Sequence, residues 1–118
     1  HRFVVASIGG ELVGAAQMRL HADGSRELGS LVVAPQHRGQ GIAQHLIAQL
    51  LGEQHGTVHV VTPRANATHY ERWGFRTLAA RQAPRAVRHN YLLGQLIDSL
   101  MALLRGRWPR RLTILVRA

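Results

Sequence analysis

The residues with the clearest chemical potential are two glycines, Gly39 and Gly41, which follow an apolar run that ends at Val33. Glycines separated by one residue let the backbone approach a ligand closely, and the first amides of a helix have no partner within that helix. Those amides and the helix dipole favour an anion at the helix start. After Gly41, apolar residues recur at the spacing of one helix face, at Ala43, Leu46, Ile47, Leu50 and Leu51. The pattern predicts a strand, a phosphate-binding turn and an amphipathic helix.

Two common phosphate sites do not fit this turn. A P-loop needs a lysine followed by serine or threonine after its last glycine, but Ile42 and Ala43 stand there and the sequence contains no lysine. A dinucleotide-binding fingerprint needs a third glycine where this sequence has Gln44. Helix starts prefer serine, threonine, aspartate or asparagine, and none lies between Val33 and Ala43. An anion in place of the missing cap is the economical explanation.

What remains is the pattern Arg38-x-x-Gly41-x-Ala43, preceded by Val33-Ala34-Pro35. This pattern resembles the acyl-CoA pyrophosphate signature of the GNAT superfamily of N-acyltransferases. A second segment, Tyr70-Glu71-Arg72-Trp73-Gly74-Phe75, resembles the Tyr-x-x-x-Gly-Phe ending that follows the next strand and helix of the same superfamily.

The sequence before Tyr70 departs from the family pattern. Such sequences often carry an asparagine about two turns before the tyrosine and an alanine one turn before it. Here Pro63 and Asn66 occupy those places, or Ala67 takes the second place in a register shifted by one residue. The role of Asn66 therefore stays open.

The resemblance implies an α/β fold, with a mixed sheet of about six strands flanked by helices. It also implies an acetyl-CoA-dependent N-acetyltransferase, in which an amine attacks the thioester directly in a ternary complex. The splayed strand near Val33 is expected to offer backbone amides to the thioester oxygen and the pantetheine arm. The residues implied in acyl-CoA binding are Leu31, Val32, Val33, Arg38, Gly39, Gln40, Gly41, Ile42, Ala43, Asn66 and Tyr70.

The implied reaction needs a proton donor for the leaving thiolate and a proton acceptor for the attacking ammonium. By its place in the second motif, Tyr70 resembles the family's general acid, and a tyrosine pKa of about 10 suits donation to a thiolate. Glu27, at the start of the strand that leads to the first motif, is the expected general base. The alternative for Glu27 is an exposed glutamate paired with Arg26 or Arg19. The alternate bases are His59 and His69.

Composition predicts one domain over residues 1–118, in which residues 3–80 carry the resemblance and residues 81–118 form an atypical extension. The absence of cysteine excludes a thiolate nucleophile, and the eight histidines show no metal-binding spacing, so no metal is expected. The net charge of +9 comes from 15 arginines against six acidic residues. This charge favours an anionic partner such as CoA. Nucleic acid is a minor alternative because few aromatic residues accompany the arginines. A cytoplasmic location is the default for CoA chemistry.

The expected strand order begins with a hairpin, residues 3–8 and 12–20, that turns through Gly9-Gly10. A third strand at 27–33 completes an antiparallel meander, and residues 57–62 are expected to run parallel to it. Further strands are expected at 75–80 and 112–116. Relatives have a strand and one or two helices before the hairpin, and these are missing from this sequence.

The extension contains an apolar stripe at helical spacing, flanked by arginines. Its members are Leu92, Leu93, Leu96, Ile97, Leu100, Met101 and Leu104. We expect this helix to bury the stripe on the sheet or over the acceptor cleft; the alternative is a helix that lies on a membrane surface or forms a homodimer. A competing function is a non-catalytic acyl-CoA-binding module that docks to a membrane or a protein through this helix. The amine acceptor, a small molecule or a peptide N-terminus or side chain, is not specified by the sequence.

Overall fold

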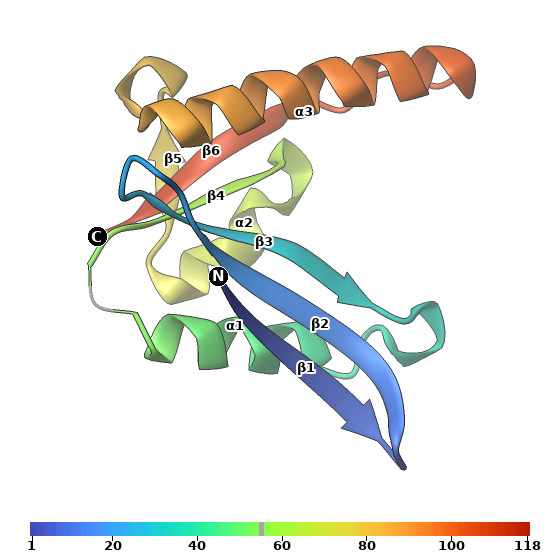
Figure 1. Cartoon of the computed structure of the whole chain (residues 1–118). Coiled ribbons are helices and arrows are strands. Elements are labelled where there is room, and N and C mark those ends of the chain that lie inside the picture. Colours follow the sequence, from blue (N-terminus) through green and yellow to red (C-terminus); the bar gives the residue numbers. More distant parts are fainter. Residues whose placement is uncertain (55) are drawn as a thin grey trace.

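The computed structural model describes residues 1–54 and 56–118, and the side chain of Ser30 is outside this description. The described residues form one six-stranded sheet in the order β1-β2-β3-β4-β6-β5. Helix α1 lies against one face of the sheet and helix α3 against the other (Figure 1). The strands and helices are β1 (Arg2–Ile8), β2 (Glu11–Leu20), β3 (Arg26–Val33), α1 (Ile42–Gly52), β4 (Val58–Pro63), α2 (Ala67–Tyr70), β5 (Arg76–Leu78), α3 (Arg85–Leu104) and β6 (Leu112–Arg117). Four short 3-10 turns occupy Pro35–His37, Arg64–Asn66, Glu71–Trp73 and Ala80–Gln82.

The predicted hairpin and meander are confirmed. Gly9 and Gly10 both have positive φ angles, 58° and 82°, as the tight two-residue turns of β-hairpins require. β1 pairs antiparallel with β2, and β2 pairs antiparallel with β3. The strand expected over residues 75–80 is shorter, because β5 ends at Leu78 and a 3-10 turn follows.

Helix α1 is fixed to the sheet by its apolar face. Its buried side chains are Leu46, Ile47, Leu50 and Leu51, and they join a core that includes Val4, Ala16, Leu28 and Val60. Each fully buried leucine or isoleucine contributes roughly 1.5–3 kcal/mol of transfer free energy. This packing holds the start of α1 beside the end of β3.

Strands β3 and β4 run parallel, as predicted, but they stay together over only a short length. Glu27 pairs with His59 and Leu28 with Val60. No pairing with β4 is recorded for Leu31–Val33 in the described part of β3, while Val32 and Val33 still pair with β2. The two strands diverge in Figure 1 beyond this pairing. The backbone of Leu31–Val33 therefore presents an open edge to a ligand.

Helix α3 packs on the sheet, but not by the face that the sequence analysis predicted. Its buried residues are Val87, Asp98 and Ala102, and it contacts β6 and β4. The predicted stripe lies mostly on the opposite side, where Leu92, Leu93, Leu96, Ile97, Leu100 and Leu104 are exposed. Among the described helices, none has the length and apolar character needed to cross a bilayer.

Beyond Val87, the buried face of α3 is made of small and polar residues, because the helix lies close to β6. A Cβ atom at Gly94 would lie 3.1 Å from Leu112 Cδ1, which is tighter than an ordinary contact. Gln95 also binds this strand, since its Oε1 accepts a hydrogen bond from the Leu112 amide at 2.9 Å. Close approach and specific polar contacts replace a broad apolar seam.

Candidate active site

The start of α1 has the geometry of an anion site. Gly41 is the N-cap residue, with φ 81° in the left-handed region, and no side chain caps the helix. The first helical hydrogen bond runs from the His45 amide to the Gly41 carbonyl at 3.1 Å. The amides of the three residues between them therefore have no partner within the helix. A Cβ atom at Gly41 would meet no atom within 4 Å, so the space above the turn is open.

These amides face a pocket of about 680 Å³. The pocket lies between the open end of β3, the start of α1 and the segment that follows β4. Of the residues expected to bind acyl-CoA, its lining includes Leu31, Val32, Val33, Arg38, Gly39, Gly41, Ile42, Ala43, Asn66 and Tyr70. Gln40 is exposed and does not line the pocket. The two motifs, separate in sequence, thus contribute to one cavity whose amide donors suit a diphosphate.

Several lining residues were not predicted as site residues. They are His37, Gln44, Ile47, Arg72 and Trp73, while His69, an alternate base in the sequence analysis, lines the same pocket. Arg72 and Trp73 lie within the second motif, and the Arg72 guanidinium sits 5.4 Å from the centroid of the Trp73 ring. His37 Nδ1 is buried and has no hydrogen-bond partner among the described residues. Their positions within or just after the two motifs were the available signal, and the sequence analysis did not use it.

Arg38 links the glycine turn to the end of β3. Its Nε donates a hydrogen bond to the Val33 carbonyl at 3.2 Å, which ties the turn to the end of β3. The guanidinium keeps further N–H donors, because only Nε is used in this contact. Arg38 can therefore hold the turn and still contact an anion in the pocket.

Tyr70 stands where this pocket meets a second one. Its ring packs edge-on against Phe75, with centroids 5.8 Å apart, and tilted against Trp73 at 6.3 Å. Burial raises the pKa of the Tyr70 hydroxyl, and a hydrogen bond with Thr62 opposes that shift. The raised pKa keeps the hydroxyl protonated at neutral pH, as a proton donor requires.

The second pocket, of about 630 Å³, lies between α3 and strands β3 and β4. Leu31, Asn66 and Tyr70 line both pockets. The charged residues of its lining come from α3 and the segment before β6, and they are Asp98, Arg105, Arg107 and Arg110. A molecule in each pocket would therefore meet the other beside Tyr70.

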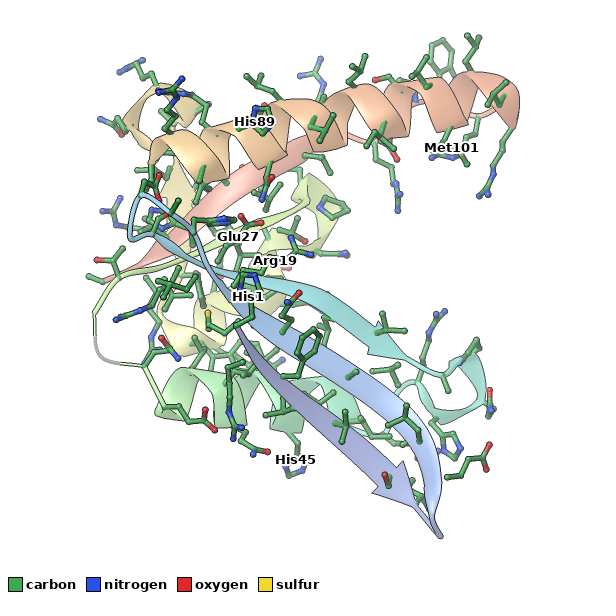
Figure 2. The ribbon with its side chains drawn as sticks, in the orientation of Figure 1. His1, Arg19, Glu27, His45, His89 and Met101 are labelled. Carbon is green, nitrogen blue, oxygen red and sulfur yellow. The ribbon has the colours of Figure 1, made fainter. Side chains whose placement is uncertain are left out.

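Glu27 lies outside both pockets. Its side chain is 4% exposed, and Oε1 is 2.9 Å from both His21 Nε2 and Asn90 Nδ2. The Arg19 guanidinium is 3.9 Å from the other carboxylate oxygen. Figure 2 shows Glu27 and Arg19 between α3 and the strands below it. The structure thus places the carboxylate in a buried link between the meander and α3, and its expected role as a base stays a prediction.

The two alternate bases lie in different surroundings. His59 is buried on β4 beside Glu27, its Nδ1 has no partner among the described residues, and burial lowers its pKa. His69 is exposed and lines the pocket at the start of α1. Within the described part of the chain, no three histidine, aspartate or glutamate side chains gather as a metal site.

Asp98 organises the segment between α3 and β6. One carboxylate oxygen accepts hydrogen bonds from Arg107 Nη2 and Arg110 Nε, each at 3.0 Å, and the other accepts from the Arg110 amide at 2.6 Å. The Arg107 hydrogen bond and the Arg110 amide are the largest causes that lower the Asp98 pKa to about 2. The carboxylate therefore stays charged near neutral pH.

Asp98→Asn is expected to destabilise the fold in a pH-dependent way. The folded pKa lies below the unfolded value of about 3.9, so the stabilisation is complete above that value and is lost as pH falls through about 2. The variant should lower the thermal unfolding midpoint at pH 7 and converge with the parent protein near pH 2. Scanning calorimetry across this range measures it, with Glu11→Gln as the exposed control. An equal difference at every pH would contradict the assignment.

Comparison with known proteins identifies the family of this chain. Residues 1–77 match the family model described as "Acetyltransferase (GNAT) domain". The chain belongs to the GNAT acetyltransferase family. The search of curated protein sequences found no match to this chain.

Solved structures share the GNAT fold with this chain. N-acetylglutamate synthase from Neisseria gonorrhoeae, in complex with CoA and N-acetyl-glutamate, has a TM-score of 0.73 and 22% identity over 98% of this chain. This chain spans 25% of that synthase. Escherichia coli ElaA has a TM-score of 0.67 and 14% identity, covering 98% of this chain and 67% of its own. The ribosomal-protein-S18-alanine N-acetyltransferase from Escherichia coli has a TM-score of 0.62 and 17% identity, covering 94% and 64%. At these identities the likeness shows the fold.

Proposed function

We propose that this GNAT domain is an N-acyltransferase that moves an acetyl group from acetyl-CoA to a primary amine by direct attack in a ternary complex. The observation that carries the proposal is the meeting of two pockets at Tyr70. One pocket has the amide donors for a diphosphate, and the other is open to a second substrate. The structural neighbour from Neisseria gonorrhoeae is complexed with CoA, which supports acyl-CoA as the donor.

The donor side is built largely from backbone. The unpaired amides at the start of α1 and the Arg38 guanidinium would hold the diphosphate. The open edge of Leu31–Val33 would pair with the amides of the pantetheine arm and direct an N–H at the thioester oxygen. These donors are fixed before substrate arrives, because β2 and α1 hold the backbone on either side.

At the junction, the amine nitrogen forms a bond to the thioester carbonyl and the carbon–sulfur bond breaks. After the new bond forms, the nitrogen releases its extra proton to solvent. The departing thiolate takes the proton of the Tyr70 hydroxyl, and solvent returns a proton to the tyrosinate. The ammonium form of the acceptor must lose a proton before attack. Glu27 is the base expected from the sequence, but its side chain lies outside both pockets, so its part in this step is tested by substitution.

The variant Glu27→Gln tests whether the Glu27 carboxylate acts as the base or has only a structural role. Since the side chain is buried against His21 and Asn90, we expect the variant to lower the unfolding midpoint and to keep the shape of the pH–rate profile. Initial rates from pH 5 to 10, normalised to folded protein, measure this. Loss of the acidic limb of the profile would instead establish Glu27 as the base.

The proposed function is tested by the release of CoA thiol from acetyl-CoA across a panel of primary amines. Amine-dependent thiol release with a matching acetylated product supports an acyltransferase. Binding of acetyl-CoA by calorimetry without release for any amine would remove the catalytic proposal.

A second candidate is an acyl-CoA-binding module that docks on an anionic membrane surface through α3. The observation that favours it is the exposed apolar face of that helix, which includes Leu103 and Leu104 at 77% and 80% exposure. Trp108 follows at 91%, and Arg85 and His89 precede at helical spacing. An amphipathic helix with cationic residues and an exposed tryptophan suits anionic lipid headgroups.

Sedimentation with phosphatidylserine vesicles tests the second candidate. We expect the parent protein to sediment with these vesicles and Leu96→Glu combined with Leu100→Glu to stay in solution. Equal binding to vesicles of uncharged lipid would contradict docking on anionic lipid. So would a homodimer in light scattering that the two substitutions convert to a monomer.

A further inference from the structure

The acceptor pocket carries an excess of positive charge. Its charged lining consists of three guanidinium groups and one carboxylate, from Arg105, Arg107, Arg110 and Asp98. The Asp98 carboxylate is charged near neutral pH, because its pKa is lowered to about 2. Two positive charges therefore remain uncompensated by other charges in the lining.

Asp98 fixes two of the guanidiniums in place. Arg110 binds the carboxylate through both Nε and Nη2, at 3.0 and 2.9 Å. Arg107 donates one Nη to Asp98 and the other to the Trp108 carbonyl, at 3.0 and 3.1 Å. Each guanidinium has five N–H donors, so both arginines keep donors for a ligand. The Asp98 side chain is almost fully buried, whereas those of Arg107 and Arg110 are 34% and 63% exposed, so a buried carboxylate orients two guanidiniums that solvent and a ligand can reach.

Arg105 is placed differently. It is the C-cap residue of α3 and lines the same pocket, but among the described residues no carboxylate contacts its guanidinium. Its charge therefore faces the pocket and solvent without an internal counterion. An acidic group on a ligand would supply that counterion, whereas a second ammonium group would be repelled by all three arginines.

The volume limits the size of the ligand. A pocket of about 630 Å³ suits a small metabolite, and its inner wall is apolar, from Leu28, Val60 and Leu112. The arginines line the side formed by α3 and the following segment, while Tyr70 lies where the pocket meets the donor side. A molecule with an amine at one end and a carboxylate at the other could place the amine beside Tyr70 and the carboxylate among the arginines.

We propose that the acceptor is a small primary amine that also carries a carboxylate, held by Arg105, Arg107 and Arg110. The proposal rests on the acyltransferase function above and names the chemical class of its acceptor. Arginine suits this role because its planar donors match a carboxylate in a bidentate manner. The domain should discriminate against diamines and polyamines of the same length.

Matched acceptors test the charge requirement. Thiol release is measured for alanine against ethylamine, γ-aminobutyrate against butylamine and putrescine, and ε-aminocaproate against hexylamine. We expect at least one carboxylated member to exceed the matched monoamine without a carboxylate in kcat/KM by about tenfold or more, since a hydrogen-bonded charge pair is worth that factor. Putrescine is expected to be the weakest acceptor.

Variants identify the groups responsible. Arg105→Gln is expected to raise KM for the carboxylated acceptor about tenfold, with kcat and the rate for the matched monoamine nearly unchanged. Arg111→Gln is the control, because that exposed arginine belongs to the same segment but does not line the pocket. Circular dichroism checks that both variants fold.

The outcomes separate this proposal from the acyltransferase function. Turnover of amines with no preference for a carboxylate, or an equal effect of the Arg105 and Arg111 variants, overturns the acceptor class and leaves the acyltransferase intact. No thiol release with any amine, despite acetyl-CoA binding, overturns the function and the acceptor class together.

Discussion

Tyr70→Phe is expected to lower kcat about 100-fold, because general acid catalysis contributes a factor of that order or more. The hydroxyl stands where the two pockets meet, and burial raises its pKa. Phenylalanine keeps the ring that packs on Phe75 and Trp73, so the affinity for CoA should be unchanged. Steady-state kinetics and calorimetric titration with CoA measure the two quantities separately.

The control for this variant is Tyr91→Phe, which removes a hydroxyl from α3 outside both pockets. It should leave kcat unchanged. The parent enzyme should lose activity at alkaline pH only above the ordinary tyrosine value of about 10, because a raised pKa keeps Tyr70 protonated below it. A Tyr70 variant with full turnover would remove the hydroxyl from the mechanism.

The second large effect is expected from Gln44→Glu, which places a negative charge at the start of α1. Gln44 is exposed in the first helical turn and lines the donor pocket. A carboxylate there is favourable for the helix dipole and so stabilises the helix by about 0.3–1 kcal/mol. The same charge repels the diphosphate of CoA and competes for the free amides. We expect the dissociation constant for CoA to rise about tenfold or more, as roughly 1.4 kcal/mol of repulsion would produce.

The Gln44 variant separates binding from folding, because we expect it to weaken CoA binding and to stabilise the helix. Gln49→Glu, exposed later on α1 and outside the pocket, is the matched control for added charge. Calorimetry should show weaker CoA binding only for the Gln44 variant, with an unfolding midpoint no lower than that of the parent protein. Equal affinity for CoA in the two variants would place the diphosphate elsewhere.

The pocket proposed for the acyl donor could be predicted from sequence because its requirements are local. Gly39 and Gly41, the missing cap and the apolar face of α1 each act over a few residues. The structure then brought the second motif to the same pocket through Tyr70, as the family resemblance implied. The remaining wall of the pocket is the end of β3, which is exposed because β3 diverges from β4. The parallel pairing of these strands is recorded at only two residue pairs.

The face that α3 buries could not be predicted, because periodicity shows which residues share a face but not which face meets the sheet. The apolar stripe suggested burial, yet Gly94 and Ala102 lie on the buried side with Asp98. An aspartate can be buried there only because Arg107 and Arg110 satisfy its carboxylate. That contact joins residues about ten positions apart across a turn that helix periodicity does not describe.

The position of Glu27 was missed for a related reason. A glutamate at the start of a strand usually lies at the surface, and both the catalytic and the exposed interpretations assumed access to solvent. In the structure Asn90 of α3 covers it, so the burial of Glu27 depends on a contact 63 residues away in sequence.

The most direct test of the account is a crystal structure of the protein with CoA. The account predicts diphosphate oxygens within hydrogen-bond distance of the first amides of α1, and the CoA sulfur beside the Tyr70 hydroxyl. The pantetheine arm should lie along Leu31–Val33 between the two diverging strands. CoA bound outside this pocket, or a sulfur remote from Tyr70, would contradict it.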